Sequence, residues 1–445
     1  GLRTYGGSTL TLNSKITNIT VDAPLSTASG YTAGINMGGD TQDSREGKLA
    51  VNGDSLTIKA SNSNAYNTFG VTMWSDDGGG QGLTADFNVK NMEITAEAKG
   101  GGHAFGINAN NGIKSHVNIT GDYLNINTSS ILNGGSRTGN AQAITMSGAN
   151  SSAVIDTKKS VFSSYSEASA ANVLLAINGA SIQVKGETEL TAVTGEVDSA
   201  SYMANAAYAS NGGNIVVGAE NASVKMTGNI LAYGGDSTVT ANFSGTDSFL
   251  TGLAVKDSDT DSINLSFKNG ARWNVDLASQ NPTSTKSIIT NLHIENSTID
   301  LTANGTAEER APGSIYQQLV VDNMTGGNGL FIIGADWTTG QSDWVDITTA
   351  EAATHYLKIQ DLTDKEDKTQ KIDKPGTVNF DSNVLLIVDR SDSITLEALA
   401  EDTGGIWGRS YNLISLDGYW NVTGVNNYYS ANTKALLNST EAAYY

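Results

Sequence analysis

The stretch LAVNGDSLTIKA (49–60) decides the fold, because close copies of it follow at regular intervals along the chain. The copies FNVKNMEITAEA (87–98) and VNITGDYLNINT (117–128) carry the same alternation of apolar and polar side chains. An alternation of period two is typical of a strand with one buried and one exposed face. The repeat therefore predicts many short strands that share one apolar interior.

A second phrase recurs with the same rhythm. Its copies are AGINMGGD (33–40), FGVTMWSDDG (69–78), FGINANNG (105–112), AITMSGAN (143–150) and LAINGAS (175–181). Aligned at Ile35, Val71, Ile107, Ile144 and Ile177, they give intervals of 36, 36, 37 and 33 residues. A later copy places Leu253 76 residues after Ile177, about two periods further on.

Each unit of roughly 36 residues is interpreted as three strands and three turns. A three-stranded unit cannot bury its own apolar face, whereas stacked units cover one another. The sequence therefore predicts an all-β fold, a right-handed three-sided parallel β-helix, over residues 1–305.

The composition limits the possible partners and sites. The 445 residues carry a formal charge of −20 and no cysteine. Such a charge repels nucleic acid, so no nucleic-acid partner is expected, and disulfides and thiolate metal sites are excluded. The four histidines have no metal-ligand spacing, and neither a metal nor another cofactor is expected. No membrane helix and no signal peptide are apparent, which favours a mature or trimmed segment.

The same opening stretch raises the question of a catalytic serine, since Gly53-Asp54-Ser55-Leu56 matches the nucleophile block of GDSL esterases. Alignment of the repeats places Ser55 where Tyr123 stands. Such an esterase also needs an Asp-x-x-His pair, and no histidine stands in that pattern. The Gly-Asp pair is interpreted instead as a turn, with glycine supplying a positive φ.

The rhythm changes after ANGTAEERAPGS (303–314), where charges cluster around a proline. The stretches 315–347 and 353–362 predict longer, hairpin-like strands, and the last stretch, 430–445, is helix-like. The order of glycines, aromatics and strands over roughly 315–425 resembles the autochaperone region of type V (AIDA/pertactin-like) autotransporter passengers. The residues that carry this resemblance are Leu319, Val321, Asn323, Met324, Gly327, Gly329, Phe331, Asp336, Gly340, Asp343, Val345, Asp361, Gly405, Trp407, Tyr411, Leu413, Gly418 and Trp420.

The resemblance implies a bacterial passenger on the cell surface or secreted, which crosses the outer membrane unfolded. It implies three segments: β-helix coils over 1–305, an autochaperone-like cap over 306–428, and the start of a linker helix over 429–445. A partner would be the chain's own outer-membrane barrel, which this sequence does not contain. The loop 362–375 is more charged than is usual in the family.

Two acidic stretches are candidate ligand sites. Asp257, Asp259 and Asp261 alternate in KDSDTDS (256–262), and three carboxylates at this spacing can converge on calcium. The stretch lacks the glycine and closing glutamate of an EF-hand, and a solvated acidic loop is the favoured interpretation.

The other stretch is WSDDGGGQG (74–82), in which Trp74 could stack on a sugar ring while Asp76 and Asp77 accept its hydroxyls; a flexible loop is the favoured interpretation. The 50 residues between Val217 and Phe267 also predict a long excursion around 231–262. Several such loops would wall a groove.

These features favour a non-enzymatic adhesin with no catalytic residues. Its expected partners are a host extracellular-matrix protein or glycan, including glycosaminoglycans, or a second copy of itself in aggregation and biofilm. The alternative is a polysaccharide-active β-helix enzyme, a lyase or a hydrolase.

Overall fold

The computed structural model describes residues 1–5, 7–23, 30–39, 46–64, 66–75, 82–109, 114–132, 139–195, 203–275, 286–302, 316–336, 340–361, 376–402 and 407–429. Every regular element among them is a strand, and so they contain no helix that could cross a membrane. The chain divides into two compact units, the first covering Gly1–Ser266 and the second beginning at Phe267.

The strands of the first unit are β1 (Leu2–Tyr5), β2 (Thr9–Asn13), β3 (Ile16–Ala23), β4 (Thr32–Gly39), β5 (Gly47–Asn62), β6 (Thr68–Ser75), β7 (Leu83–Ala98), β8 (Ala104–Ala109), β9 (Ser115–Ser130), β10 (Ala141–Ser147), β11 (Ser152–Ser166), β12 (Ala171–Ile177), β13 (Ser181–Val184), β14 (Glu187–Thr194), β15 (Ala204–Ser210), β16 (Asn214–Val217), β17 (Val224–Thr227), β18 (Asn229–Tyr233), β19 (Thr238–Ser244), β20 (Phe249–Thr251) and β21 (Ala254–Lys256). The division between the units falls within β22 (Ser262–Lys268).

The strands of the second unit are β23 (Arg272–Asn274), β24 (Lys286–Glu295), β25 (Thr298–Asp300), β26 (Gln318–Thr325), β27 (Leu330–Asp336), β28 (Gln341–Ser342), β29 (Trp344–Ala350), β30 (Ala353–Asp361), β31 (Gly376–Asp389), β32 (Ile394–Ala398), β33 (Glu401–Asp402), β34 (Trp407–Leu416) and β35 (Tyr419–Tyr429).

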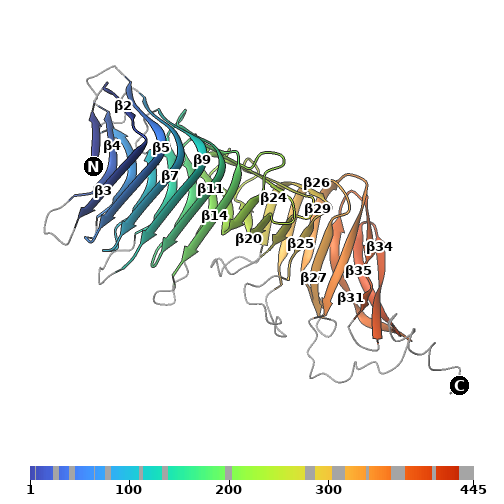
Figure 1. The fold of residues 1–445 in the computed structure, drawn as a ribbon. Coiled ribbons are helices and arrows are strands. Elements are labelled where there is room, and N and C mark those ends of the chain that lie inside the picture. Colours follow the sequence, from blue (N-terminus) through green and yellow to red (C-terminus); the bar gives the residue numbers. More distant parts are fainter. Residues whose placement is uncertain are drawn as a thin grey trace, which may run out of the picture. The chain divides into compact units, whose positions relative to one another are not determined.

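The first unit is a parallel β-helix, as its repeats predict. Long strands β5, β7, β9 and β11 pair in parallel and lie side by side (Figure 1). Short strands β4, β6, β8 and β10 form a second parallel array. Apolar side chains from successive coils stand above one another in the interior. Val51, Phe87 and Ile119 form one such column, and each is almost completely buried. Burial of these columns is the main term that stabilises the unit.

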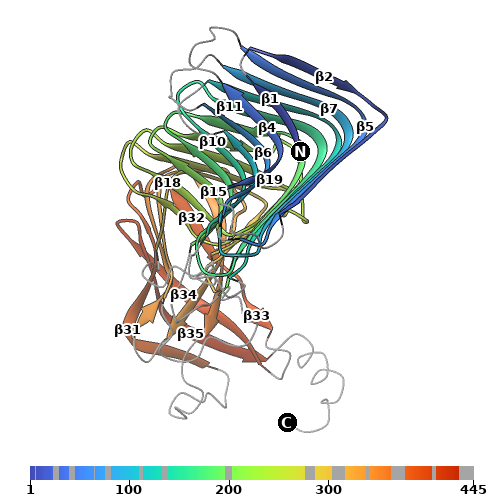
Figure 2. The same ribbon diagram turned by 90° about the vertical axis from the view of Figure 1, so that its left-hand side faces the viewer.

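The corner at the Gly-Asp pairs differs from the predicted turn. Strand β5 runs without a break from Gly47 to Asn62 and bends there, as β7 does (Figure 2). Neither Gly53 nor Gly121 has a positive φ. Glycine is needed because a Cβ would come within 2.0 Å of a carbonyl oxygen of the adjacent coil, at Ser14 and Val89 respectively. The four coils from β4 to β11 therefore hold two strands each instead of three.

Left-handed turns lie at another corner, where the short strands end. Asn178-Gly179 and Asn211-Gly212 both adopt positive φ, which these residue types tolerate best. The two turns stack, and Gly179 donates its N–H to the carbonyl of Asn211 at 3.1 Å.

The alignment of the short strands is confirmed for its first four members. Ile35 pairs with Val71, Val71 with Ile107, and Ile107 with Ile144. The fifth member is wrong, because Ile144 pairs with Leu174.

The later coils are shorter than predicted. Hydrogen bonds from Ser237 to Asp261 and from Leu253 to Asn229 join residues 24 apart. Three coil steps, from β12 through β15 and β18 to β21, therefore fill the distance assigned to two periods. The predicted excursion around 231–262 is likewise wrong, since these residues form regular strands. The shorter repeat reflects shorter connections: one residue separates β17 from β18, whereas ten residues separate β9 from β10.

The second unit continues with parallel pairing before it turns antiparallel. Strand β26 pairs in parallel with β24 and β29, and β27 with β25 and β30. The hairpin prediction for 315–347 and 353–362 is therefore wrong for β26, β29 and β30, but it holds where β27 is followed by β28, since Ala335 pairs antiparallel with Ser342. Antiparallel pairing joins β31, β34 and β35 at the end of the described chain.

Residues that carry the family resemblance have structural roles in this unit. Phe331 and Val345 lie in its core. Asp343 is buried and accepts the N–H groups of Gln317 and Gly334 at 2.7 and 2.8 Å. Gly418 has a φ of 79° in the turn between β34 and β35. Gly405 and residues 430–445 of the predicted linker helix lie outside the described residues, whereas Tyr429, its first predicted residue, ends strand β35.

Candidate functional site

A polar column runs along the outer side of the short strands. Asn36, Thr72, Asn108 and Thr145 follow one another in register on β4, β6, β8 and β10. Their chain neighbours point inward, so these side chains face away from the apolar core. They are nevertheless buried, with Thr72 3% and Asn108 6% exposed. The column therefore lies under other groups on the outer surface.

Aromatic rings supply much of this cover. Phe69 and Phe105 pair on adjacent strands and stack, with ring centroids 4.9 Å apart and planes 8° apart. Tyr31 meets Phe69 edge-on at 5.8 Å and Trp74 edge-on at 6.2 Å. Rings arranged in this way hold one another in place, each pair contributing about 0.5–1.5 kcal/mol beyond its buried area.

The rings and the column enclose a pocket of about 280 Å³. Its lining residues are Tyr31, Asn67, Phe69, Thr72, Trp74, Phe105 and Asn108. All of these side chains are uncharged at neutral pH.

Two asparagines in this region differ in their hydrogen bonding. Both ends of the Asn36 amide are engaged, since its Nδ2 donates to the Tyr31 hydroxyl at 2.8 Å and its Oδ1 accepts Trp74 Nε1–H at 3.1 Å. Asn108 Oδ1 is buried and has no partner among the described residues. A buried acceptor left without a donor costs about 1–3 kcal/mol, so a donor that enters the pocket regains this free energy.

His103 lies against the outer edge of this aromatic group. Its ring is 5.9 Å from that of Phe105, and its Nδ1 accepts the N–H of Asn140 at 2.9 Å. Burial lowers the pKa of His103, so the ring is neutral at pH 7. It therefore adds no charge beside the pocket.

The structure places one of the predicted ligand residues in this pocket. Trp74 lines it, whereas Asp76 and Asp77 lie outside the described residues. Sequence reasoning missed Tyr31, Phe69, Phe105 and Asn108. The available signal was the recurrence of phenylalanine at the same place in the phrases that begin at 69 and 105.

The second acidic stretch is not a site of converging carboxylates. Asp257 and Asp259 are exposed, whereas Asp261 is 1% exposed. Its Oδ1 accepts the N–H of Ser237 at 3.0 Å, and its Oδ2 accepts both the N–H and the hydroxyl of Ser258 at 3.2 and 2.8 Å. Asp261 therefore joins two coils. The described residues hold no group of three or more His, Cys, Asp or Glu side chains that could bind a metal.

Substitution of Asp261 by alanine is expected to destabilise the first unit by about 2–3 kcal/mol, because the buried N–H of Ser237 and the partly buried donors of Ser258 lose their acceptor. Asp259→Ala is the matched control and should change stability by no more than about 0.5 kcal/mol, since its side chain is exposed. Denaturant unfolding followed by circular dichroism measures both. If Asp261→Ala leaves the free energy of unfolding unchanged, Asp261 does not have this structural role.

Ser55 occupies the bend in β5 and pairs with Asn91, which in turn pairs with Tyr123. This register confirms the alignment that placed Ser55 over Tyr123. The neighbouring Asp54 forms an ion pair with Lys90 at 2.6 Å, and Asp122 one with Lys158 at 2.8 Å. The corner thus carries ion pairs between coils rather than a nucleophile.

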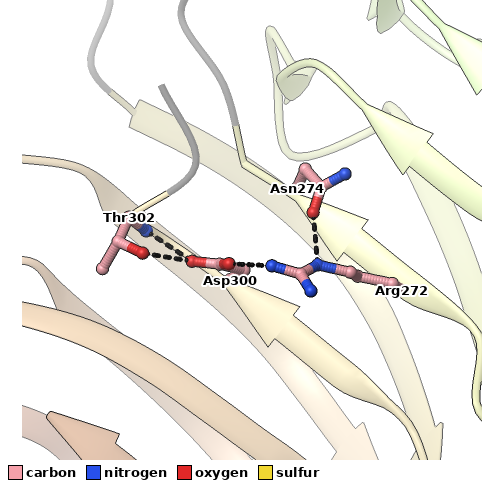
Figure 3. Close-up of polar contacts among 4 residues, drawn as sticks. All are labelled: Arg272, Asn274, Asp300 and Thr302. Carbon is pink, nitrogen blue, oxygen red and sulfur yellow. Dashed lines mark hydrogen bonds and ion pairs between the residues drawn. The ribbon is translucent and has the colours of Figure 1, made fainter. Parts of the chain in front are cut away.

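A charged cluster around Arg272 lies in the second unit. Arg272 on β23 forms an ion pair with Asp300 on β25, and its Nε also donates to Asn274 (Figure 3). The other carboxylate oxygen of Asp300 accepts the N–H and the hydroxyl of Thr302 at 2.8 and 2.6 Å (Figure 3). Both oxygens of Asp300 are engaged, so the cluster ties two coils of the second unit together.

No protein-family model matches this sequence, and no curated protein matches it. Among solved structures the chain is similar to the crystal structure of the Haemophilus influenzae Hap adhesin, at 12% sequence identity and a TM-score of 0.29. The likeness covers 92% of this chain and 43% of that chain, so this chain spans less than half the length of that protein.

Proposed function

We propose that this chain is a non-enzymatic adhesive passenger of a bacterial autotransporter, displayed on the cell surface or secreted. Its binding would be non-covalent, to a host extracellular-matrix protein or glycan or to a second copy of the chain. The observation that carries the proposal is a contrast among its polar groups. The buried carboxylates of Asp261, Asp300 and Asp389 are engaged in hydrogen bonds within the fold. In the aromatic pocket, by contrast, Asn108 Oδ1 has no donor among the described residues.

An enzyme of the polysaccharide-active β-helix type would need carboxylates or basic groups free to act on a substrate. Asp346 is held by both Nε and Nη2 of Arg390, at 2.8 and 2.7 Å. Asp389 accepts N–H groups from Ser393 and Ile394 at 2.6 and 2.8 Å. Such contacts engage these two carboxylates within the fold, which disfavours them as catalytic groups.

The outer surface suits many weak contacts. Short neutral side chains join coil to coil, as Asn88 does with Asn52 at 3.0 Å and Thr120 with Asn88 at 2.8 Å. A face of this kind can associate with the same face of another copy through many weak hydrogen bonds, and many copies on one cell raise the effective affinity. The net charge of −20 opposes anionic ligands beyond contact range, so glycosaminoglycans are the least favoured partners.

The second unit would act as the autochaperone. Its parallel strands offer a preformed template on which a further coil can pair, which removes the costly nucleation of a parallel sheet. Its partner would be an outer-membrane barrel that holds the passenger during secretion.

Display of the chain on bacteria through an outer-membrane barrel tests the adhesive function. We expect the cells to clump, or to be retained on plates coated with matrix protein or glycan, in excess of control cells that display the barrel alone. Unchanged clumping and retention would remove the adhesin proposal. Release of reducing or unsaturated sugar from a glycan panel would support the enzyme instead.

A further inference from the structure

We infer that the aromatic pocket of the first unit is a binding site for one uncharged pyranose ring of a glycan. The inference deepens the proposed adhesive function by naming its ligand class. It is carried by three features of the lining: the ring geometry around Tyr31, the unpartnered oxygen of Asn108, and the lack of charge.

The ring geometry suits the apolar face of a sugar. The planes of Phe69 and Trp74 both stand at 86° to the plane of Tyr31. These rings form walls whose orientation is fixed by their own contacts and by the hydrogen bond from Trp74 Nε1 to Asn36. Walls that are already in place need little ordering on binding, so a small ligand loses less affinity.

The unpaired oxygen of Asn108 favours a ligand that carries a hydroxyl group. It is an acceptor, and it lies buried in the pocket lining without a donor among the described residues. A hexose carries several O–H donors around a ring whose C–H groups can lie on an aromatic face. An aromatic or proline side chain of a protein would fill the space between the rings but leave Asn108 Oδ1 unpaired, so such a ligand is disfavoured.

The charge of the lining selects among sugars. None of the described residues that line the pocket is charged, and the whole chain is strongly acidic. A carboxylate or sulfate would enter without a cationic partner and lose its hydration. Uronates, sialic acid and sulfated sugars are therefore excluded, and neutral hexoses are accepted.

The volume indicates one ring. A pocket of about 280 Å³ stands at the low end of ligand sites, which span about 300–1,000 Å³. A single ring of this size binds weakly, with a Kd of about 1 mM. Useful adhesion would come from many copies on one cell.

Titration of the purified chain with methyl glycosides of neutral hexoses, followed by saturation-transfer NMR, tests the site. Methyl glucuronide and a sulfated hexose serve as negative ligands. We expect at least one neutral glycoside to bind and to receive saturation from the protein chiefly at its ring C–H protons. Trp74→Ala should weaken this binding at least about tenfold, because it removes one wall.

Asn108→Leu separates binding from folding. It removes the unpartnered acceptor at similar volume, so it should weaken sugar binding about tenfold while the melting temperature stays unchanged or rises. Tyr208→Ala is the matched control, since Tyr208 continues the Asn108 column through Thr145 and Leu175 but lies outside the pocket. It should leave binding intact.

The possible outcomes separate the two proposals. Cells that adhere while no glycoside binds, or while Trp74→Ala binds as well as the parent, would overturn the sugar site and leave the adhesive function standing. Glycoside binding by a chain whose display changes neither clumping nor retention would do the reverse. If a proline-rich or aromatic peptide inhibits cell adhesion and sugars do not, the pocket would be assigned to a protein partner and the inference would be overturned.

Discussion

Replacement of Phe87 by alanine is expected to lower the free energy of unfolding of the first unit by about 3–5 kcal/mol. Phe87 is completely buried on β7, and it stands between Val51 of the coil before and Ile119 of the coil after. Truncation of the ring leaves a cavity that both neighbouring coils line, and a continuous stack cannot collapse to fill it. Chemical denaturation followed by circular dichroism measures the loss.

Phe105→Ala provides a matched control on the same unit. Phe105 lies on the outer face and stacks against Phe69, so its removal is expected to cost only about 1 kcal/mol. Equal losses for Phe87→Ala and Phe105→Ala would contradict the assignment of inner and outer faces on which the β-helix depends.

Acidification from pH 7 to pH 4 is expected to remove about 3 kcal/mol of stability from the second unit through His355 alone. The side chain is 1% exposed, lies 5.8 Å from the ring of Phe331, and accepts the Gly329 N–H through Nδ1 at 3.2 Å. Burial lowers the pKa of His355 from 6.5 to about 4. Because the unfolded chain takes up this proton near pH 6.5 and the folded chain only near pH 4, the contribution is complete above pH 6.5. It is lost as the pH falls through that interval.

His355→Asn isolates this contribution from the titration of the carboxylates. Asparagine keeps an acceptor near the position of Nδ1 and carries no proton to titrate. The difference in the free energy of unfolding between the parent and His355→Asn should be constant above pH 7 and should shift by about 3 kcal/mol against the parent by pH 4. A difference that does not vary with pH would show that His355 does not titrate in this interval.

The sequence was sufficient for the parallel β-helix and for most of its interior. Alternation of period two identifies which side chains face the core, and a fixed repeat identifies which residues stack, because each coil must cover the apolar face of the last. Ser55 could therefore be aligned with Tyr123 before any coordinates were known. The alignment failed at Ile177, because the connection between β11 and β12 has four residues where that between β9 and β10 has ten, so a fixed period no longer applies.

Glycine at the corners was correctly recognised as constrained, but for another reason than the true one. The letters of a Gly-Asp pair do not distinguish a turn with positive φ from a bend where a carbonyl of the preceding coil would lie 2.0 Å from a Cβ. That distance depends on how two coils pack. The role of Asp261 was hidden in the same way, since Ser237 lies 24 residues away from it.

What the chain determined by itself is thus the side on which each residue of a strand lies, and with it the stacked interior. Only the tertiary structure decided what covers the outer face. Tyr31, Phe69, Trp74, Phe105 and Asn108 come from different coils, and they become a pocket because parallel register brings residues about 36 apart within contact distance. Local alternation sets orientation, whereas the curvature and length of each coil set which outward side chains meet.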